Sequence, residues 1–84
     1  MDKEKVLKVC NQIADKGLLK TLEIKFTDVG SDFLTATMPV NEKVYQPDGI
    51  LHGGATVALA VTVGSAAVAV LTKNSNLTIR GIEI

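Results

Sequence analysis

The sequence has almost nothing from which a metal centre or a covalent cross-link could be built. Cys10 is the only cysteine and His52 the only histidine, so an internal disulfide and a structural zinc site are both excluded. A lone cysteine fits a reducing compartment, and we expect a cytoplasmic protein that needs no metal or organic cofactor. The first ten residues intersperse acids with lysines and lack an apolar run, which predicts no signal peptide.

An excess of charge of one sign is also missing. Nine basic and nine acidic residues cancel, and no basic run occurs, so nucleic acid is not an expected partner. The 84 residues suffice for one small domain and not for two. A domain of this size buries only about 60–65% of the surface of its unfolded chain. We therefore expect a single domain, residues 1–84, that is marginally stable unless it associates with further copies.

Apolar residues recur at helical and then at strand spacings in the first half of the chain. Asp2 is placed to cap a helix whose apolar positions include Val6, Cys10 and Ile13, and Gly17 is a suitable residue to end that helix. Alternating apolar residues then predict a β-hairpin over residues 21–40. The inward-facing positions are expected to be Leu22, Ile24 and Phe26 on the first strand and Leu34, Ala36, Met38 and Val40 on the second.

The second half is dominated by one long apolar segment. A loop with Pro-Asp-Gly turn chemistry, residues 41–50, leads into a run from Gly53 to Leu71 that contains no proline and much alanine. The run predicts a helix roughly 28 Å long, and because it is apolar on nearly every side we expect it to be buried all round. Residues 77–84 predict a further strand, with a bulge at Gly81 where the apolar alternation changes parity.

The junction between the loop and the long helix carries the residues with chemical potential. A helix N-terminus presents unpaired backbone N–H groups, and glycine in its first turn lets a substrate approach them closely. Gly53 is placed to polarise a carbonyl oxygen, with His52 and Gln46 as further hydrogen-bonding groups. Ser65, about three turns later, is placed to position a water or a reacting carboxylate. Each residue alone is more simply read as turn, cap or packing, and only the combination indicates acyl transfer.

The segment QPDGILHGGATVALAVTVGSAA, with the preceding hairpin and the following GIEI, resembles the hotdog-fold acyl-CoA thioesterases. The resemblance is strongest to the branch with the 4-hydroxybenzoyl-CoA and 1,4-dihydroxy-2-naphthoyl-CoA thioesterases and the phenylacetate-pathway proteins. It implies an α+β fold in which a curved antiparallel sheet wraps one long helix. It also implies acyl-CoA as the substrate and a homo-oligomer, a dimer or a dimer of dimers, with active sites at the subunit interface.

Roles for individual residues also follow from this resemblance. Gln46 matches the amide side chain near the thioester, His52 the histidine of the motif, and Gly53 the backbone N–H that polarises the thioester carbonyl. Ser65 matches a hydroxyl residue of the partner subunit that supports the nucleophile or water. The catalytic carboxylate of the family lies nine residues after the histidine, where this sequence has Val61. Valine can neither attack a thioester nor activate water.

Three functions stay open at this point. The first is an acyl-CoA thioesterase impaired by Val61, and the second is a non-catalytic remnant that oligomerises or binds acyl groups. The third is a small membrane protein, because residues 55–71 form an uncharged run at the lower length limit for a span. The Ala, Thr, Gly and Ser in that run favour the first two. Since the family has further strands after the position of GIEI, we expect a C-terminally truncated chain with an incomplete sheet.

Overall fold

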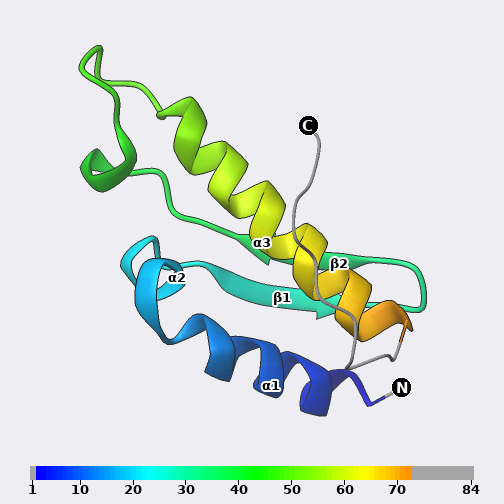
Figure 1. The fold of residues 1–84 in the computed structure, drawn as a ribbon. Coiled ribbons are helices and arrows are strands. Elements are labelled where there is room, and N and C mark those ends of the chain that lie inside the picture. Colours follow the sequence, from blue (N-terminus) through cyan, green and yellow to red (C-terminus); the bar gives the residue numbers. More distant parts are fainter. Residues whose placement is uncertain (1, 73–84) are drawn as a thin grey trace.

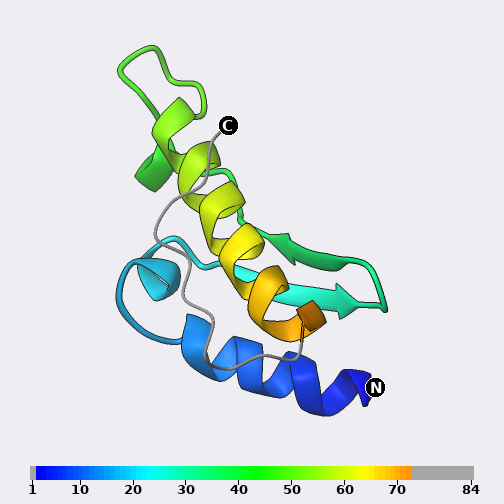
Figure 2. The same ribbon diagram turned by 45° about the vertical axis from the view of Figure 1, so that its right-hand side comes forward.

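The computed structural model describes residues 2–72. A two-stranded antiparallel sheet has one helix beside its first strand and a long helix passing across one of its faces (Figures 1 and 2). This is the α+β arrangement that the sequence predicted, while the strand predicted at 77–84 and its bulge at Gly81 lie outside the described residues. The elements are α1 (Lys3–Ala14), α2 (Gly17–Thr21), β1 (Lys25–Val29), β2 (Leu34–Thr37), the short 3₁₀ helix η1 (Glu42–Val44) and α3 (Gly53–Thr72).

The first helix begins as predicted and ends earlier. Asp2 Oδ1 accepts a hydrogen bond from the Lys5 N–H at 3.2 Å, which confirms the predicted N-cap. α1 already ends at Ala14, so the prediction that Gly17 ends it was wrong. Gly17 has the positive φ of 58° that favours glycine, but this conformation serves the corner at which α2 begins. The five residues of α2 are too few for an apolar periodicity to reveal them.

A left-handed residue closes α2 and delays the first strand to Lys25. Glu23 has a φ of 59°, its N–H donates to the Lys20 carbonyl at 3.0 Å, and the Ile24 N–H donates to the Leu19 carbonyl at 3.0 Å. This is the Schellman arrangement, in which two N–H groups beyond a helix satisfy its last carbonyls. A residue with a side chain is usually disfavoured in this conformation, by roughly 1–2 kcal/mol.

The first strand contains a bulge that alternation alone did not predict. The register with β2 shifts between Phe26 and Asp28, so Thr27 is an extra residue in β1. Unbroken alternation would place Asp28 on the inward face after Phe26. The bulge places Val29 there instead, and Val29 is completely buried. The hairpin thus keeps a carboxylate out of the apolar layer.

The second strand keeps its predicted face for most of its length. Leu34, Ala36 and Met38 are half-buried, as the alternation predicts. Val40 is 58% exposed, so the prediction that it faces inward was wrong. The strand ends two residues before Pro39, which has no N–H with which to continue a ladder.

The side chain of Asn11 ties α1 to β1 by two hydrogen bonds. Its Nδ2 donates to the Phe26 carbonyl at 3.0 Å, and its Oδ1 accepts from the Phe26 N–H at 2.8 Å. One side-chain amide thereby satisfies both backbone polar groups of a residue whose side chain is buried. In the sequence Asn11 is only one of several polar residues on α1, so the pattern does not single it out.

The apolar core lies where α1, the hairpin and the last turns of α3 meet. Burial raises the pKa of the Cys10 thiol in this core. No residue of α3 from Gly53 to Leu71 is fully buried, so the expectation of a helix buried all round was wrong for one chain by itself. A two-stranded sheet and one further helix cover only part of its circumference. The core cluster at this place consists of Cys10, Ala14 and Phe26, surrounded by Val6, Leu7, Leu19, Leu34, Ala36, Ala66 and Val70.

Candidate functional site at the start of the long helix

A tight turn precedes the long helix and carries Gln46. The Gly49 N–H donates to the Gln46 carbonyl at 2.9 Å, and the Gln46 N–H donates to the Ile50 carbonyl at 2.8 Å. Gly49 has a φ of 78°, so this position of the turn favours glycine. The side chain of Gln46 is half-buried and makes no hydrogen bond to any residue between 2 and 72. Its amide therefore remains available to a ligand.

The backbone and the side chain of His52 together cap α3. The His52 N–H donates to the Val44 carbonyl at 2.7 Å, which anchors the end of the loop to η1. The His52 carbonyl accepts from the Ala55 N–H at 3.0 Å, and its Nδ1 accepts from the Gly54 N–H at 2.8 Å. Histidine thus takes the place that serine, threonine or aspartate usually has at a helix N-cap.

The two glycines that follow His52 differ in what surrounds them. A Cβ on Gly53 would meet no atom within 4 Å, whereas a Cβ on Gly54 would come within 2.9 Å of His52 Nδ1. The Gly54 N–H is occupied by the imidazole, and the Gly53 N–H donates to no residue in the described part of the chain. The first turn of α3 therefore has one unoccupied donor in open surroundings, at the glycine predicted to hold a carbonyl oxygen.

A small cavity adjoins this junction. Its volume is about 260 Å³, and it lies between α2, η1 and the first two turns of α3. Tyr45, which is 44% exposed, is a lining residue that the sequence did not single out. Nothing in the local pattern distinguishes this tyrosine from any other loop residue. The lining residues are Leu18, Leu22, Lys43, Val44, Tyr45, His52, Gly54, Ala55 and Ala58.

Val61 and Ser65 lie in a second, separate depression. Both line an apolar groove of about 830 Å³ between α1 and α3, together with Cys10 and Phe26. Ser65 is about three turns from Gly53, or roughly 18 Å along the helix. Within one chain, Gln46, His52 and Gly53 therefore lie at the N-terminal end of α3, and Ser65 lies too far along the helix to act with them. Their roles in thioester chemistry stay predictions.

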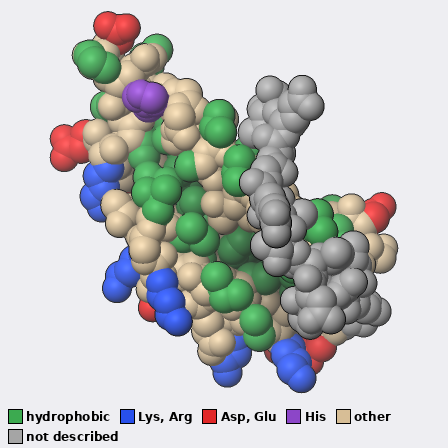
Figure 3. All heavy atoms as spheres, in the orientation of Figure 1, with side chains coloured by type: hydrophobic (Ala, Val, Ile, Leu, Met, Phe, Trp, Pro, Cys, Tyr) green, Lys and Arg blue, Asp and Glu red, His purple; other side chains and the backbone are tan. Residues whose placement is uncertain are grey.

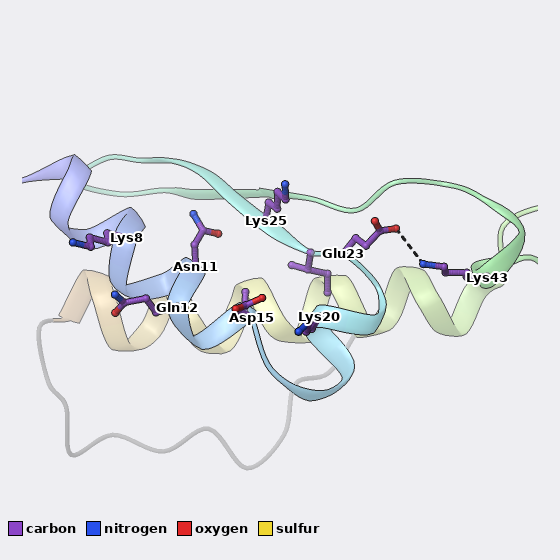
Figure 4. Close-up of a pocket in the computed structure, with 10 residues that line it drawn as sticks. Lys8, Asn11, Gln12, Asp15, Lys20, Glu23, Lys25 and Lys43 are labelled. Atoms are coloured by element: carbon purple, nitrogen blue, oxygen red, sulfur yellow. Dashed lines mark ion pairs between the residues drawn. The ribbon is translucent and has the colours of Figure 1, made fainter.

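The polar depression between α1, α2 and β1 does not form an anion site. It has a volume of about 800 Å³, and four lysines line it. Lys43 is paired with Glu23 at 3.7 Å, and Figure 4 shows Lys8 and Lys25 extending away from that pair in different directions. Lysines that diverge into solvent do not enclose a bound phosphate. The described residues also contain no group of three or more His, Cys, Asp or Glu side chains that could hold a metal ion.

The apolar surface of α3 is extensive. Figure 3 shows hydrophobic side chains spread over the face on which α3 lies, with lysines gathered along the lower edge of the molecule. The stretch Gly53–Leu71 has a mean hydropathy of 2.0, and by length and composition it is apolar enough to cross a membrane. The core helix of a soluble protein can have the same length and composition. Hydropathy therefore indicates that this helix is buried against an apolar partner, but it does not distinguish protein from membrane lipid.

The sequence and the fold both match known thioesterases. No family model matches the sequence. Over 78 residues, or 93% of the chain, it is 40% identical to 1,4-dihydroxy-2-naphthoyl-CoA hydrolase of Escherichia coli K12 and 42% identical to proofreading thioesterase EntH of Cronobacter turicensis. The structure aligns with a crystal structure of a mutant thioesterase from Pseudomonas aeruginosa over 75% of the chain, with a TM-score of 0.72 and 38% identity. The chain spans 57%, 56% and 45% of these three proteins, or about half their length.

Proposed function

Because the chain belongs, over the part that it spans, to the hotdog-fold thioesterase family, we propose that it carries the carbonyl-binding half of an acyl-CoA thioesterase site. The observation that carries this proposal is the unoccupied Gly53 N–H at the open start of α3. The proposed ligand is an acyl-CoA thioester, in keeping with the substrate that the name of the Escherichia coli relative states.

The chemistry proposed for this end of the helix is polarisation of the thioester carbonyl. The Gly53 N–H and the positive end of the α3 dipole stabilise the negative charge that develops on the carbonyl oxygen. A single donor of this kind contributes about 3–4 kcal/mol in acyl-transfer enzymes. The unpaired amide of Gln46 supplies a second contact from the preceding turn. None of these groups activates water.

The step that the described residues lack is delivery of a nucleophile. Val61 occupies the position at which the family resemblance expects a carboxylate, and its isopropyl group neither accepts a proton nor attacks a carbonyl. General acid–base help contributes about 10²–10⁴-fold in rate. We therefore propose that the 84-residue chain binds thioesters and hydrolyses them at or near the uncatalysed rate.

The proposed assembly is a cytoplasmic homo-oligomer in which a second copy covers α3. Exposed apolar residues include Val57 of α3 at 45% exposure and Ile50 of the preceding loop at 59%. An uncovered apolar face of this kind marks an interaction surface in soluble proteins. Size-exclusion chromatography with light scattering should give a dimer or tetramer without detergent. A monodisperse monomer at micromolar concentration would contradict this assembly, and solubility only in detergent would favour a membrane-bound helix.

Two measurements test the site. Release of CoA from benzoyl-CoA and phenylacetyl-CoA by the unmodified chain should equal the buffer rate, and robust turnover would contradict the impairment by Val61. The variant Val61→Glu should gain activity in a chain extended with the C-terminal half of the Escherichia coli relative, because that extension completes the protein that the chain only half spans. Val61→Gln in the same extended chain is the matched control, since glutamine has the size of glutamate without its charge.

A second function is supported by the apolar groove of about 830 Å³ that contains Val61 and Ser65. A valine at the carboxylate position leaves this groove without a charged residue, and its mainly apolar lining suits binding of an acyl chain without hydrolysis. Binding of acyl-CoA without turnover, abolished by Ala66→Trp in the groove, would favour this non-catalytic module. Binding that survives Ala66→Trp would place the acyl group elsewhere.

A further inference from the structure

The contact between His52 and Gly54 has a chemical consequence for the ring itself. The Gly54 N–H donates to His52 Nδ1 at 2.8 Å, so this nitrogen must offer a lone pair and carries no proton. In a neutral imidazole the proton is then on Nε2, which is a hydrogen-bond donor. The hydrogen bond at one ring nitrogen thus determines what the other nitrogen can do.

The absence of a side chain on Gly54 is what allows this contact. A Cβ at Gly54 would come within 2.9 Å of Nδ1 and 3.1 Å of Cε1, so the ring would have to shift from this position. At Gly53 a Cβ would meet nothing within 4 Å. The fold of this chain therefore requires glycine at only one of the two positions if the ring is to stay in place.

We propose that Gly54 is a positioning residue that fixes the His52 ring with Nδ1 as the acceptor and the ring proton on Nε2, so that His52 serves the site as a hydrogen-bond donor and not as a base. This inference rests on the proposed function, because the acceptor for Nε2–H is the carbonyl oxygen of the thioester. His52 is exposed and lines the cavity of about 260 Å³ at the start of α3, so a ligand there reaches the ring.

The two groups at the start of α3 then have the same role, and neither of them is a base. Gly53 N–H and His52 Nε2–H are both donors, and both stabilise negative charge on a carbonyl oxygen. Neither removes a proton from water, because the only lone pair of the ring is occupied by Gly54. A base must therefore come from elsewhere, which explains why a valine at position 61 would leave the site able to bind and unable to hydrolyse.

The test is ¹⁵N NMR of the imidazole, which is unambiguous because the chain has one histidine. The unmodified chain at pH 8 should give the signature of a single tautomer, with a protonated Nε2 and an unprotonated Nδ1. In Gly54→Ala the ring should lose this preference and show both tautomers in exchange. Gly53→Ala, where the space is open, is the matched control and should keep the signature. Far-UV circular dichroism checks that both variants retain the helix, since alanine favours helix more than glycine does.

Three results would overturn the inference. These are a mixed or Nδ1-protonated ring in the unmodified chain, an unchanged tautomer in Gly54→Ala, or an equal loss in Gly53→Ala. The donor role is tested separately with phenacyl-CoA, a thioether that keeps the carbonyl and cannot be hydrolysed. It should shift the His52 Nε2 and Gly53 amide signals more than the Gly54 amide signal. Absence of binding would reject the proposed function, while the tautomer in the ligand-free chain still decides the role of Gly54.

Discussion

The region around α1 and β1 and the region around α3 differ in how completely the described residues bury them. At Phe26 the side chain is 5% exposed, and both backbone groups are satisfied by Asn11. Along α3 no residue up to Leu71 is fully buried, although this is the most apolar segment described. The comparison shows that hydrophobicity alone does not predict burial, because burial also requires neighbouring elements that surround the segment.

The largest expected difference is between truncations in these two regions. Phe26→Ala removes a ring from the core cluster and should lower the free energy of unfolding by about 3–5 kcal/mol, enough to unfold a small domain. Val57→Ala, at a position that is 45% exposed, should cost less than about 1 kcal/mol at low concentration. Urea unfolding followed by circular dichroism measures both. If Val57→Ala loses more unfolding free energy at high protein concentration, another copy covers α3. If the two variants lose the same unfolding free energy at low concentration, the two regions do not differ in burial as described.

The next effect concerns the hydrogen bonds between α1 and β1. Asn11→Ala leaves the Phe26 N–H and carbonyl without their partner and should cost about 1–3 kcal/mol. Asn11→Asp keeps an acceptor for the N–H but sets a carboxylate oxygen against the Phe26 carbonyl, so it separates the effects of the two hydrogen bonds. Hydrogen exchange at the Phe26 amide distinguishes the two variants. Fast exchange in Asn11→Ala with protection in Asn11→Asp is expected, and protection in both would contradict the role of this side chain.

The buried thiol of Cys10 should make the stability of the same region depend on pH. Burial raises the pKa of Cys10 in the folded state above its value in the unfolded chain. The stabilisation is therefore complete below the unfolded value, about 8.5 for a thiol, and is lost as pH rises through the higher folded value. Unfolding free energies between pH 7 and 10 should fall more steeply for the unmodified chain than for Cys10→Ala. Parallel pH profiles would mean that the thiol is not desolvated.

The smallest expected effect is at the end of α2. Glu23→Gly removes a side chain from the left-handed region and should stabilise the chain by up to about 1 kcal/mol. The variant loses the exposed ion pair with Lys43, which offsets little of this gain. Lys43→Ala breaks the same ion pair without changing Glu23 and is the matched control. A lower thermal midpoint for Glu23→Gly than for Lys43→Ala would show that the side chain matters more than the backbone conformation.

Much of the fold was predictable because its signals are local. The Asp2 cap, the hairpin and the start of α3 at Gly53 each follow from residues that are neighbours in the sequence. The residues of the candidate site could likewise be named from the loop-to-helix junction, because His52 and the glycines behind it act within one turn. The bulge at Thr27 and the short α2 were missed, since neither leaves a periodic pattern.

The sequence by itself determined that α1, the hairpin and α3 form, and it determined the chemical groups at the start of α3, because propensity, capping and glycine geometry act over a few residues. Only the tertiary structure decided that Asn11 hydrogen-bonds to the backbone of Phe26, fifteen residues away. It also decided that the His52 ring lies against Gly54 while no atom lies within 4 Å of a Cβ at Gly53. It decided as well that the described residues cover α3 only in part. These outcomes depend on how separate elements pack in space, and no local pattern encodes distances between them.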